Sequence, residues 1–274
     1  MSKEKEMSFL DHLEELRWHL IRSFASIFIF AIIAFVSKDF IFHELILGPS
    51  RTDFWTYRML CELGEKIGST VLCIESLPFE IQSRTMTGQF TMHITASFVI
   101  GLILAFPYFF WEIWRFIKPA LYSTEKNLTR GAVFFVTLLF VSGILFGYYI
   151  VSPLSINFLS NYSIDPSIKN QFDIISYVST VTMLVLACGL MFQLPMVVYF
   201  LAKAGIVTPE LMIFFRRHSV VVILVISAIL TPPDVMSQIL VALPIMLLYE
   251  VSIVIARVVV RRKRKREQRL AKRD

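Results

Sequence analysis

The most informative stretch of the sequence is Trp114-Arg115-Phe116-Ile117-Lys118-Pro119-Ala120-Leu121-Tyr122-Ser123-Thr124-Glu125. It is a short polar break between two long apolar runs. Pro119 predicts the end of an incoming helix, because its ring removes a backbone donor and restricts the preceding residue. Ser123 and Thr124 are both suitable N-caps for a following helix. Glu125 adds an isolated carboxylate. A bend of this kind at a membrane surface is typical of a docking edge rather than of a spacer.

The composition is that of a membrane protein. Of the 274 residues, 56% are hydrophobic and 25 are Phe, and the mean hydropathy is +0.66, which is outside the range of an ordinary soluble domain. The formal net charge is +6, and residues 257–273 form a dense basic run. Because this run directly follows an apolar span, we expect it to meet anionic lipid rather than nucleic acid.

The apolar runs predict an all-α fold with six membrane-spanning helices, since about 20 apolar residues cross about 30 Å of hydrocarbon. We expect the spans at about 18–36, 90–110, 131–151, 175–201, 219–230 and 235–256, the third of them stopped by Pro153. Leucines at three- and four-residue spacing in residues 8–20 predict a helix lying in the membrane interface before the first span. The last two spans look too short for a normal bilayer, because about 12 residues rise only about 18 Å.

The distribution of basic residues predicts that both termini are cytoplasmic. Lys and Arg are concentrated on the segments expected inside, as the positive-inside rule requires. Six of the 27 basic residues fall on the expected outer segments: Lys38, Arg51, Arg58, Lys66, Arg84 and Lys169. We therefore predict a membrane domain over residues 1–257, with a long outer loop at about 37–89, and a basic cytoplasmic tail over residues 258–274.

Cys61 and Cys73 both lie in the expected outer loop. A disulfide between them is chemically permitted outside the cytoplasm, and two reduced cysteines in half-buried helices are the alternative. No cluster of His or Cys accompanies them, so we expect no metal site. Gly143 and Gly147 have the spacing of close helix packing, which we interpret as internal. Cys188 is most simply a small core residue.

The chain has no motif of catalytic chemistry: HExxH, GxSxG, a Walker loop and a glycine-rich nucleotide turn are all missing. We therefore predict neither an enzyme nor a bound cofactor. Glu250 is the only acidic residue that we expect well inside a span, which argues against ion-coupled transport. A small-solute secondary transporter remains the alternative function and would need a polar path through the membrane. In a third possibility, a structural scaffold, Glu15 and Glu125 would be replaceable.

Four motifs, in order, carry a family resemblance. They are HLEELR before the first span, FIKPALYSTEK after the second, Gln-Leu-Pro in the fourth, and LTPPDVMSQ between the fifth and sixth. From about residue 8 to 257 the chain resembles TatC, the core subunit of the Sec-independent, twin-arginine protein translocase. The resemblance implies a receptor in the bacterial cytoplasmic (inner) membrane that binds twin-arginine signal peptides of folded precursor proteins. It also implies assembly with TatA- and TatB-type single-span subunits and self-association in the complex.

The resemblance makes Glu15 and Glu125 the carboxylates that receive the paired arginines of the signal. A guanidinium is always charged and meets a carboxylate through two parallel hydrogen bonds. Arg17 either orients Glu15 or contacts lipid headgroups, and Phe116 either lines the docking edge or is one of the aromatic residues common at a membrane interface. The structural alternatives are a solvated Glu15 paired with Arg17, and a Glu125 that is favoured by a helix start.

Gln193 departs from the family, which often has a glutamate at this mid-span position, where partner helices are thought to make contact. An amide can form hydrogen bonds between helices, but it cannot titrate. Alternatively, Gln193 satisfies the carbonyl of Met191, which Pro195 leaves without its usual donor. Asp234, in the expected outer reversal, belongs to a family motif tied to translocation. Its alternative role is to N-cap the sixth span.

Overall fold

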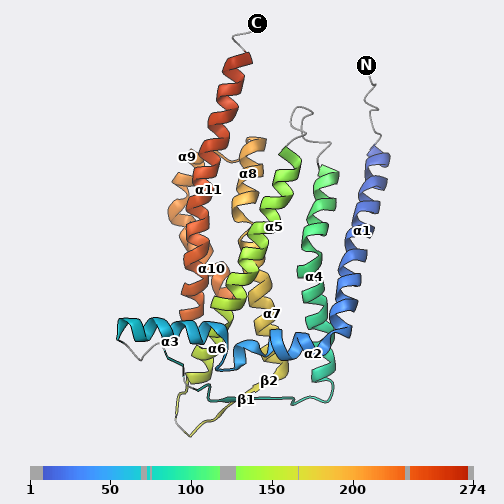
Figure 1. Ribbon diagram of the computed structural model, residues 1–274. Helices are drawn as coiled ribbons and strands as arrows, with labels where there is room; N and C mark the ends of the chain where they lie inside the picture. The colour runs from blue at the N-terminus through green and yellow to red at the C-terminus, as the bar shows by residue number, and fades with distance from the viewer. Residues whose placement is uncertain are drawn as a thin grey trace.

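The computed structural model describes residues 9–68, 73–74, 76–117, 128–165, 167–231 and 235–270. Over these residues the chain forms a bundle of long helices with a small cap across one end (Figure 1). The elements in chain order are α1 (Phe9–Val36), α2 (Lys38–Phe40), η1 (Ile41–Ile46), η2 (Gly48–Ser50), α3 (Trp55–Ile67), β1 (Phe79–Gln82), α4 (Gly88–Ile117), α5 (Leu128–Phe146), η6 (Gly147–Val151), α6 (Ser152–Asn161), β2 (Asn170–Asp173), α7 (Ile174–Met191), α8 (Leu194–Ala204), α9 (Pro209–Phe214), α10 (Arg216–Leu230) and α11 (Val235–Leu270).

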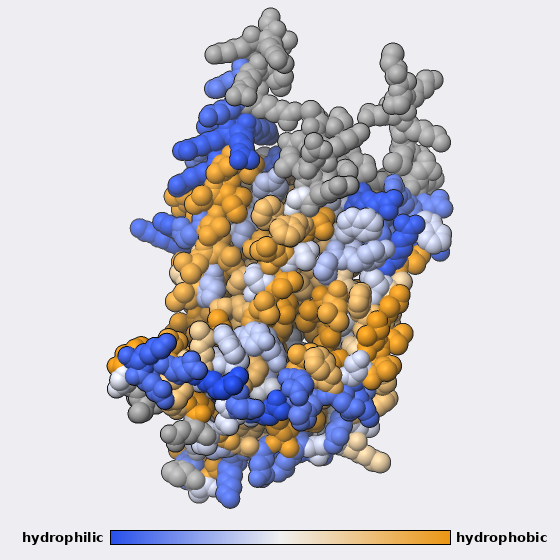
Figure 2. Space-filling view, in the orientation of Figure 1, coloured by the Kyte–Doolittle hydropathy of each residue, from blue (hydrophilic) through white to orange (hydrophobic). Residues whose placement is uncertain are grey.

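Five helical segments of the described chain are long and apolar enough to cross a membrane. They are Glu14–Val36, Gly88–Phe116, Gly131–Asn161, Ile174–Ala204 and Gln238–Lys265. Figure 2 shows hydrophobic side chains over the middle of the visible face, between hydrophilic groups near both ends. The expected fifth span corresponds to α10, whose 15 residues extend only about 22 Å. A helical, multi-pass membrane fold is therefore confirmed, and the sixth span stays a prediction.

The expectation that residues 8–20 lie flat in the interface is wrong. These residues from Phe9 onward continue into the first span as a single helix, α1, which runs beside α4 (Figure 1). The two helices approach closely at Gly101, where an added Cβ would lie 2.6 Å from the backbone nitrogen of Ala31. Farther along, His19 is only 6% exposed. Packing against α4 therefore holds the start of α1 upright.

We predicted that Pro153 ends the third span, and this prediction is wrong. The π-helical segment η6 follows α5, and α6 then carries the helix on to Asn161. Pro153 lies in the first turn of α6, a position that tolerates a residue without a backbone donor. The π turn just before it changes the hydrogen-bond pattern locally. The helix thus passes the proline without ending.

The fourth span is two helices, α7 and α8, with Phe192 and Gln193 between them. Its packing against α5 and η6 is as close as the small residues predict: a Cβ at Gly143 would lie 2.6 Å from the carbonyl oxygen of Cys188. Cys188 is a free, buried thiol. The predictions of internal glycine packing and of a core role for Cys188 are confirmed.

The expected outer loop folds into the cap. Its strand β1 pairs in parallel with β2, with Phe79 opposite Asn170, so the all-helical prediction is wrong for these short strands. In α3, Tyr57 is 1% exposed, and its hydroxyl lies 2.9 Å from the carbonyl oxygens of Pro49 and Pro153. Burial raises the pKa of Tyr57 well above its usual range, so the hydroxyl stays a donor. Cys61 and Cys73 are joined by a disulfide.

The last helix, α11, is continuous over 36 residues. It passes Pro244 and Glu250 without interruption and crosses the expected boundary between the membrane domain and the tail at residue 257. Residues 232–234, the expected outer reversal, lie outside the described residues. The first turn of α1 and the last turn of α11 lie at the same end of the bundle (Figure 1), which we call the terminal end.

Replacing Gly101 with Ala tests the α1–α4 contact. The new methyl group must push apart two backbones that touch, so we expect the free energy of unfolding to fall by about 1–3 kcal/mol. The matched control is Gly131→Ala, because a Cβ at Gly131 meets nothing within 4 Å and alanine favours the helix by up to about 1 kcal/mol. Thermal unfolding in detergent measures both. Equal melting temperatures for the two variants would contradict the close approach.

Candidate functional site

Two predicted site residues, Glu15 on α1 and Phe116 on α4, lie at the same edge of the terminal end. The Glu15 side chain is 41% exposed, and its Oε1 lies 3.9 Å from Nε2 of His19. The His19 ring in turn lies 6.2 Å from the Phe116 ring, centroid to centroid. His19, one helical turn from Glu15, therefore connects the exposed carboxylate of α1 to the aromatic side chain of α4.

Beneath this edge lies a buried polar cluster of His19, Glu112 and Tyr108, which we call the α1–α4 cluster. Nδ1 of His19 forms a hydrogen bond with Oε2 of Glu112, and the Tyr108 hydroxyl donates to Oε1 of Glu112 at 2.9 Å. The side chains of His19 and Glu112 are only 7% and 1% exposed. A buried carboxylate is tolerated only when it is hydrogen-bonded or paired. The cluster therefore fixes the start of α1 against the end of α4.

Sequence reasoning missed both His19 and Glu112. Glu112 stands among aromatic residues that we interpreted as an interfacial belt, and we expected Glu250 to be the only acidic residue well inside a span. Glu112 is buried and lies four residues from the end of the apolar segment Gly88–Phe116, just beyond residue 110, where we expected this span to end. The available signal was the acid itself: an ionisable residue at membrane depth indicates a functional or pairing role, and its partner is sought on another helix.

The remaining residues predicted for signal binding are placed less closely together. Arg17 is exposed on α1, and the side chain that approaches Glu15 in the described part of the chain is the imidazole of His19 rather than Arg17. The structural alternative of a Glu15–Arg17 pair is therefore wrong.

Glu125 lies outside the described residues, in the connection from α4 to α5. The end of α4 and the start of α5 are both at the terminal end (Figure 1).

Gln193 lies at the break between α7 and α8, and its Nε2 donates to the carbonyl oxygen of Val136 on α5 at 3.0 Å. The expected alternative, a bond to the carbonyl of Met191, is wrong, because close packing brings α5 within reach of the amide. Oε1 of Gln193 is buried and has no hydrogen-bond donor among the described residues. Asp234 lies outside them.

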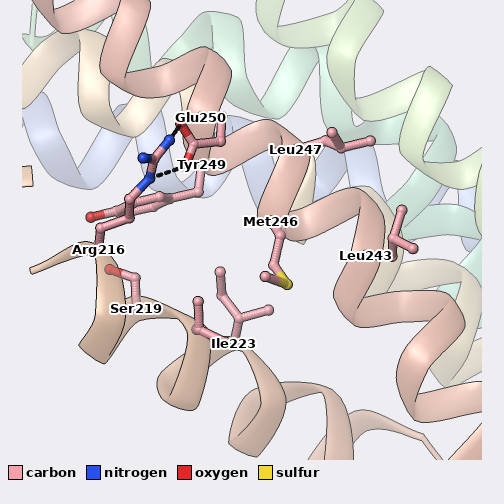
Figure 3. A pocket seen from close by; sticks show the side chains of 9 residues that line it. Arg216, Ser219, Ile223, Leu243, Met246, Leu247, Tyr249 and Glu250 are labelled. Carbon is pink, nitrogen blue, oxygen red and sulfur yellow. Dashed lines mark hydrogen bonds and ion pairs between the residues drawn. The ribbon is translucent and has the colours of Figure 1, made fainter. Parts of the chain in front are cut away.

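A separate hollow of about 300 Å³ lies between α10 and α11. Apolar side chains such as Ile223, Leu243 and Met246 line it, and an ion pair of Arg216 and Glu250 closes one side (Figure 3). Nε of Arg216 lies 2.5 Å from Oε1 of Glu250, and the second guanidinium nitrogen bonds the other carboxylate oxygen. In Figure 1, α10 and α11 stand on the opposite side of the bundle from α1, so this hollow is not part of the Glu15 edge.

Substitutions in the α1–α4 cluster test its role as a clamp. His19→Ala leaves the buried Glu112 carboxylate without its hydrogen-bond partner on α1, so we expect a loss of about 3 kcal/mol in the free energy of unfolding. The double variant His19→Ala/Glu112→Leu removes the stranded charge and recovers most of that loss. Arg17→Ala, on the exposed side of the same helix, is the control and changes little. Thermal unfolding in detergent measures the stability of all three variants. A double variant that is no more stable than His19→Ala would show that the cluster does not clamp α1 to α4.

Comparison with known proteins places this geometry in a family. The sequence model described as Sec-independent protein translocase protein (TatC) matches residues 11–244. A TatC of Blattabacterium sp. subsp. Periplaneta americana is 39% identical over 93% of this chain and 97% of its own length, and a TatC of Aquifex aeolicus is 34% identical over 94% and 98%. A crystal structure described as the twin arginine translocase receptor TatC superposes with a TM-score of 0.69 at 34% identity, covering 91% of this chain and 99% of that one. The chain belongs to the TatC family of Sec-independent protein translocases.

Proposed function

We propose that the chain is the signal-peptide receptor of a twin-arginine translocase in a bacterial cytoplasmic membrane. Its terminal end faces the cytoplasm, and α10 serves as a short fifth span among six. Family membership sets aside the solute transporter that we kept as the alternative function. The observation that carries the proposal is an exposed carboxylate, Glu15, held beside Phe116 at the end of the bundle where α4 leads into the connection that contains Glu125.

Exposure decides which described carboxylate is available to a guanidinium. Glu112 is 1% exposed and already bonded to His19 and Tyr108, so an incoming arginine cannot reach it without breaking the cluster. The Glu15 side chain is 41% exposed, and the imidazole of His19 lies 3.9 Å from its carboxylate, beyond the distance of a normal hydrogen bond. Glu15 therefore keeps its acceptor capacity for a ligand, while Glu112 holds the helix in place.

We place a second carboxylate, Glu125, at this edge, because a pair of arginines calls for a pair of acceptors. In the proposal, Glu15 takes one guanidinium and Glu125 the other, each through the two-pronged geometry that an arginine offers and a lysine lacks. Phe116 supplies an apolar wall beside the site. Arg17, exposed two residues from Glu15, orients the signal peptide or contacts the lipid headgroups around it.

The proposed partners are single-span subunits of the TatA and TatB type, together with further copies of this chain. Gln193 is the candidate contact within the membrane, because it is a polar, partly exposed residue at the break between α7 and α8, although its Oε1, which lacks a donor among the described residues, is itself buried. Asp234, in the expected outer reversal, is the candidate for a role in translocation.

Removing each carboxylate tests the receptor assignment. We expect Glu15→Gln and Glu125→Gln each to reduce crosslinking to a twin-arginine precursor at least about tenfold, because a neutral amide does not attract a guanidinium. Glu14→Gln is the matched control, since Glu14 is an exposed neighbour on α1 that points in another direction. Replacing the precursor's two arginines with lysines is expected to mimic the loss. Unchanged crosslinking in both carboxylate variants would remove the assignment.

The partner contact is tested separately at Gln193. Gln193→Leu removes both the bond to the Val136 carbonyl and the spare acceptor, so we expect a several-fold loss of co-purified single-span subunits while precursor crosslinking persists. Val136→Ala, which keeps the backbone carbonyl and removes only methyl groups, is the control. Full recovery of the partner subunits with Gln193→Leu would show that the amide acts only within the bundle.

A further inference from the structure

The cap helix α3 (Trp55–Ile67) exposes an apolar stripe that the described part of the chain does not cover. Trp55, Met59, Leu63 and Ile67 recur every fourth residue and are 50%, 44%, 42% and 74% exposed. Residues at this spacing lie along one side of a helix. The stripe is therefore a continuous surface and not a set of scattered side chains.

The other two sides of α3 have different partners. Its buried side holds Thr56, Tyr57 and Gly64, and the disulfide from Cys61 ties the returning chain to it. Its third side carries the exposed charges of Arg58, Glu62 and Glu65. An apolar side next to a charged side is the pattern of a helix that lies in a membrane interface.

The depth of α3 is fixed by its contact with the third span. Thr56 donates its hydroxyl hydrogen to the carbonyl of Tyr149, and the ring of Trp55 lies 5.5 Å from the ring of Tyr149, edge to face. Tyr149 comes 18 residues after Gly131, where this span begins, which is about 27 Å at 1.5 Å per residue. That distance is close to the thickness of the hydrocarbon core, about 30 Å. The first turn of α3 is therefore docked where the hydrocarbon ends.

The direction of α3 fits the same surface. The helix lies crosswise to the spans and projects past α6, away from the bundle (Figure 1). The stripe starts at Trp55, against the span, and continues outward from there. Next to Tyr149, Ile150 is 39% exposed, so the lipid-facing side of the span and the stripe meet at one depth. Trp and Tyr are also the residues enriched at membrane interfaces.

We propose that α3 is an interfacial anchor whose stripe (Trp55, Met59, Leu63 and Ile67) is inserted among the phospholipids of the outer leaflet. Arg58, Glu62 and Glu65 face the water and the headgroups. Lys66, beside the stripe, extends its charge to the headgroups. The disulfide and the hydroxyl of Tyr57 keep the helix from swinging away, so the cap is held level on the membrane.

Photocrosslinking from the helix surface tests this proposal. p-Benzoylphenylalanine is placed singly at Leu63 or Ile67, on the stripe, and at Arg58 or Glu65, on the charged side, in the full chain in native membranes. After irradiation, mass spectrometry identifies the adducts. We expect phospholipid adducts at 63 and 67 to exceed those at 58 and 65 at least about tenfold. Equal lipid labelling on both sides, or adducts at 63 and 67 formed mainly with a second copy or another protein, would overturn it.

A second measurement uses the native side chain, in case a bulky residue disturbs the cap. Protein in lipid nanodiscs, one chain per disc, is compared with its Trp55→Phe variant for fluorescence quenching by a phospholipid brominated near the headgroup. We expect the emission that Trp55 contributes to fall at least about twofold. Emission from Trp55 that the brominated lipid leaves unchanged would refute the anchor. Only material with an intact Cys61–Cys73 disulfide, shown by its mobility without reductant, is counted.

Discussion

A carboxylate that is almost without contact with solvent, Glu112, ties two helices together from positions 93 residues apart. Such a group is costly to bury, and the cost is offset only while His19 and Tyr108 remain in place. The geometry of the terminal end depends on this constraint. It sets the height of α1 relative to α4, and with it the position of Glu15 relative to Phe116. In the proposed function, the exposed Glu15 carboxylate is a precisely placed acceptor because the buried Glu112 restricts the movement of α1.

Elsewhere in the bundle, too, buried contacts position the helices and more exposed polar groups are left for recognition. At Gly101 and Gly143 the absence of a side chain lets backbones touch, and such contacts position helices without any polar bond. Gln193 bridges the break between α7 and α8 to α5 by a single hydrogen bond. Close helix contacts thus hold α1, which carries Glu15, and the helices on either side of the α7–α8 break. Recognition and partner contact are proposed at the borders of well-packed regions, at the exposed Glu15 carboxylate and at the partly exposed Gln193.

The sequence predicted the spans because the signal, long apolar runs, is local. It failed where a distant contact decides the outcome. The upright start of α1 depends on α4, and residues 8–20 alone have the pattern of an interfacial helix. Pro153 is a strong local stop signal, but the π turn before it and the first-turn position of the proline remove the conflict. The acids of the site divide in the same way: Glu15 was found through a motif, whereas Glu112 needed its partner His19 to be recognised. The strands β1 and β2 are too short to show a period.

The unbroken length of α11 changes how its basic side chains act. Thirty-six helical residues extend about 54 Å, well beyond the roughly 30 Å of a hydrocarbon core. The last turns of α11 therefore project from the membrane as a continuous helix instead of lying along the lipid. Since ions screen charge within about 8 Å under physiological conditions, and Lys265 lies eight residues or about 12 Å along the helix from Arg257, the anionic headgroups act far more strongly on Arg257 than on Lys265. In the proposed orientation, with the terminal end in the cytoplasm, this part of α11 carries its positive charge away from the membrane surface, where it repels other cationic segments and attracts acidic ones.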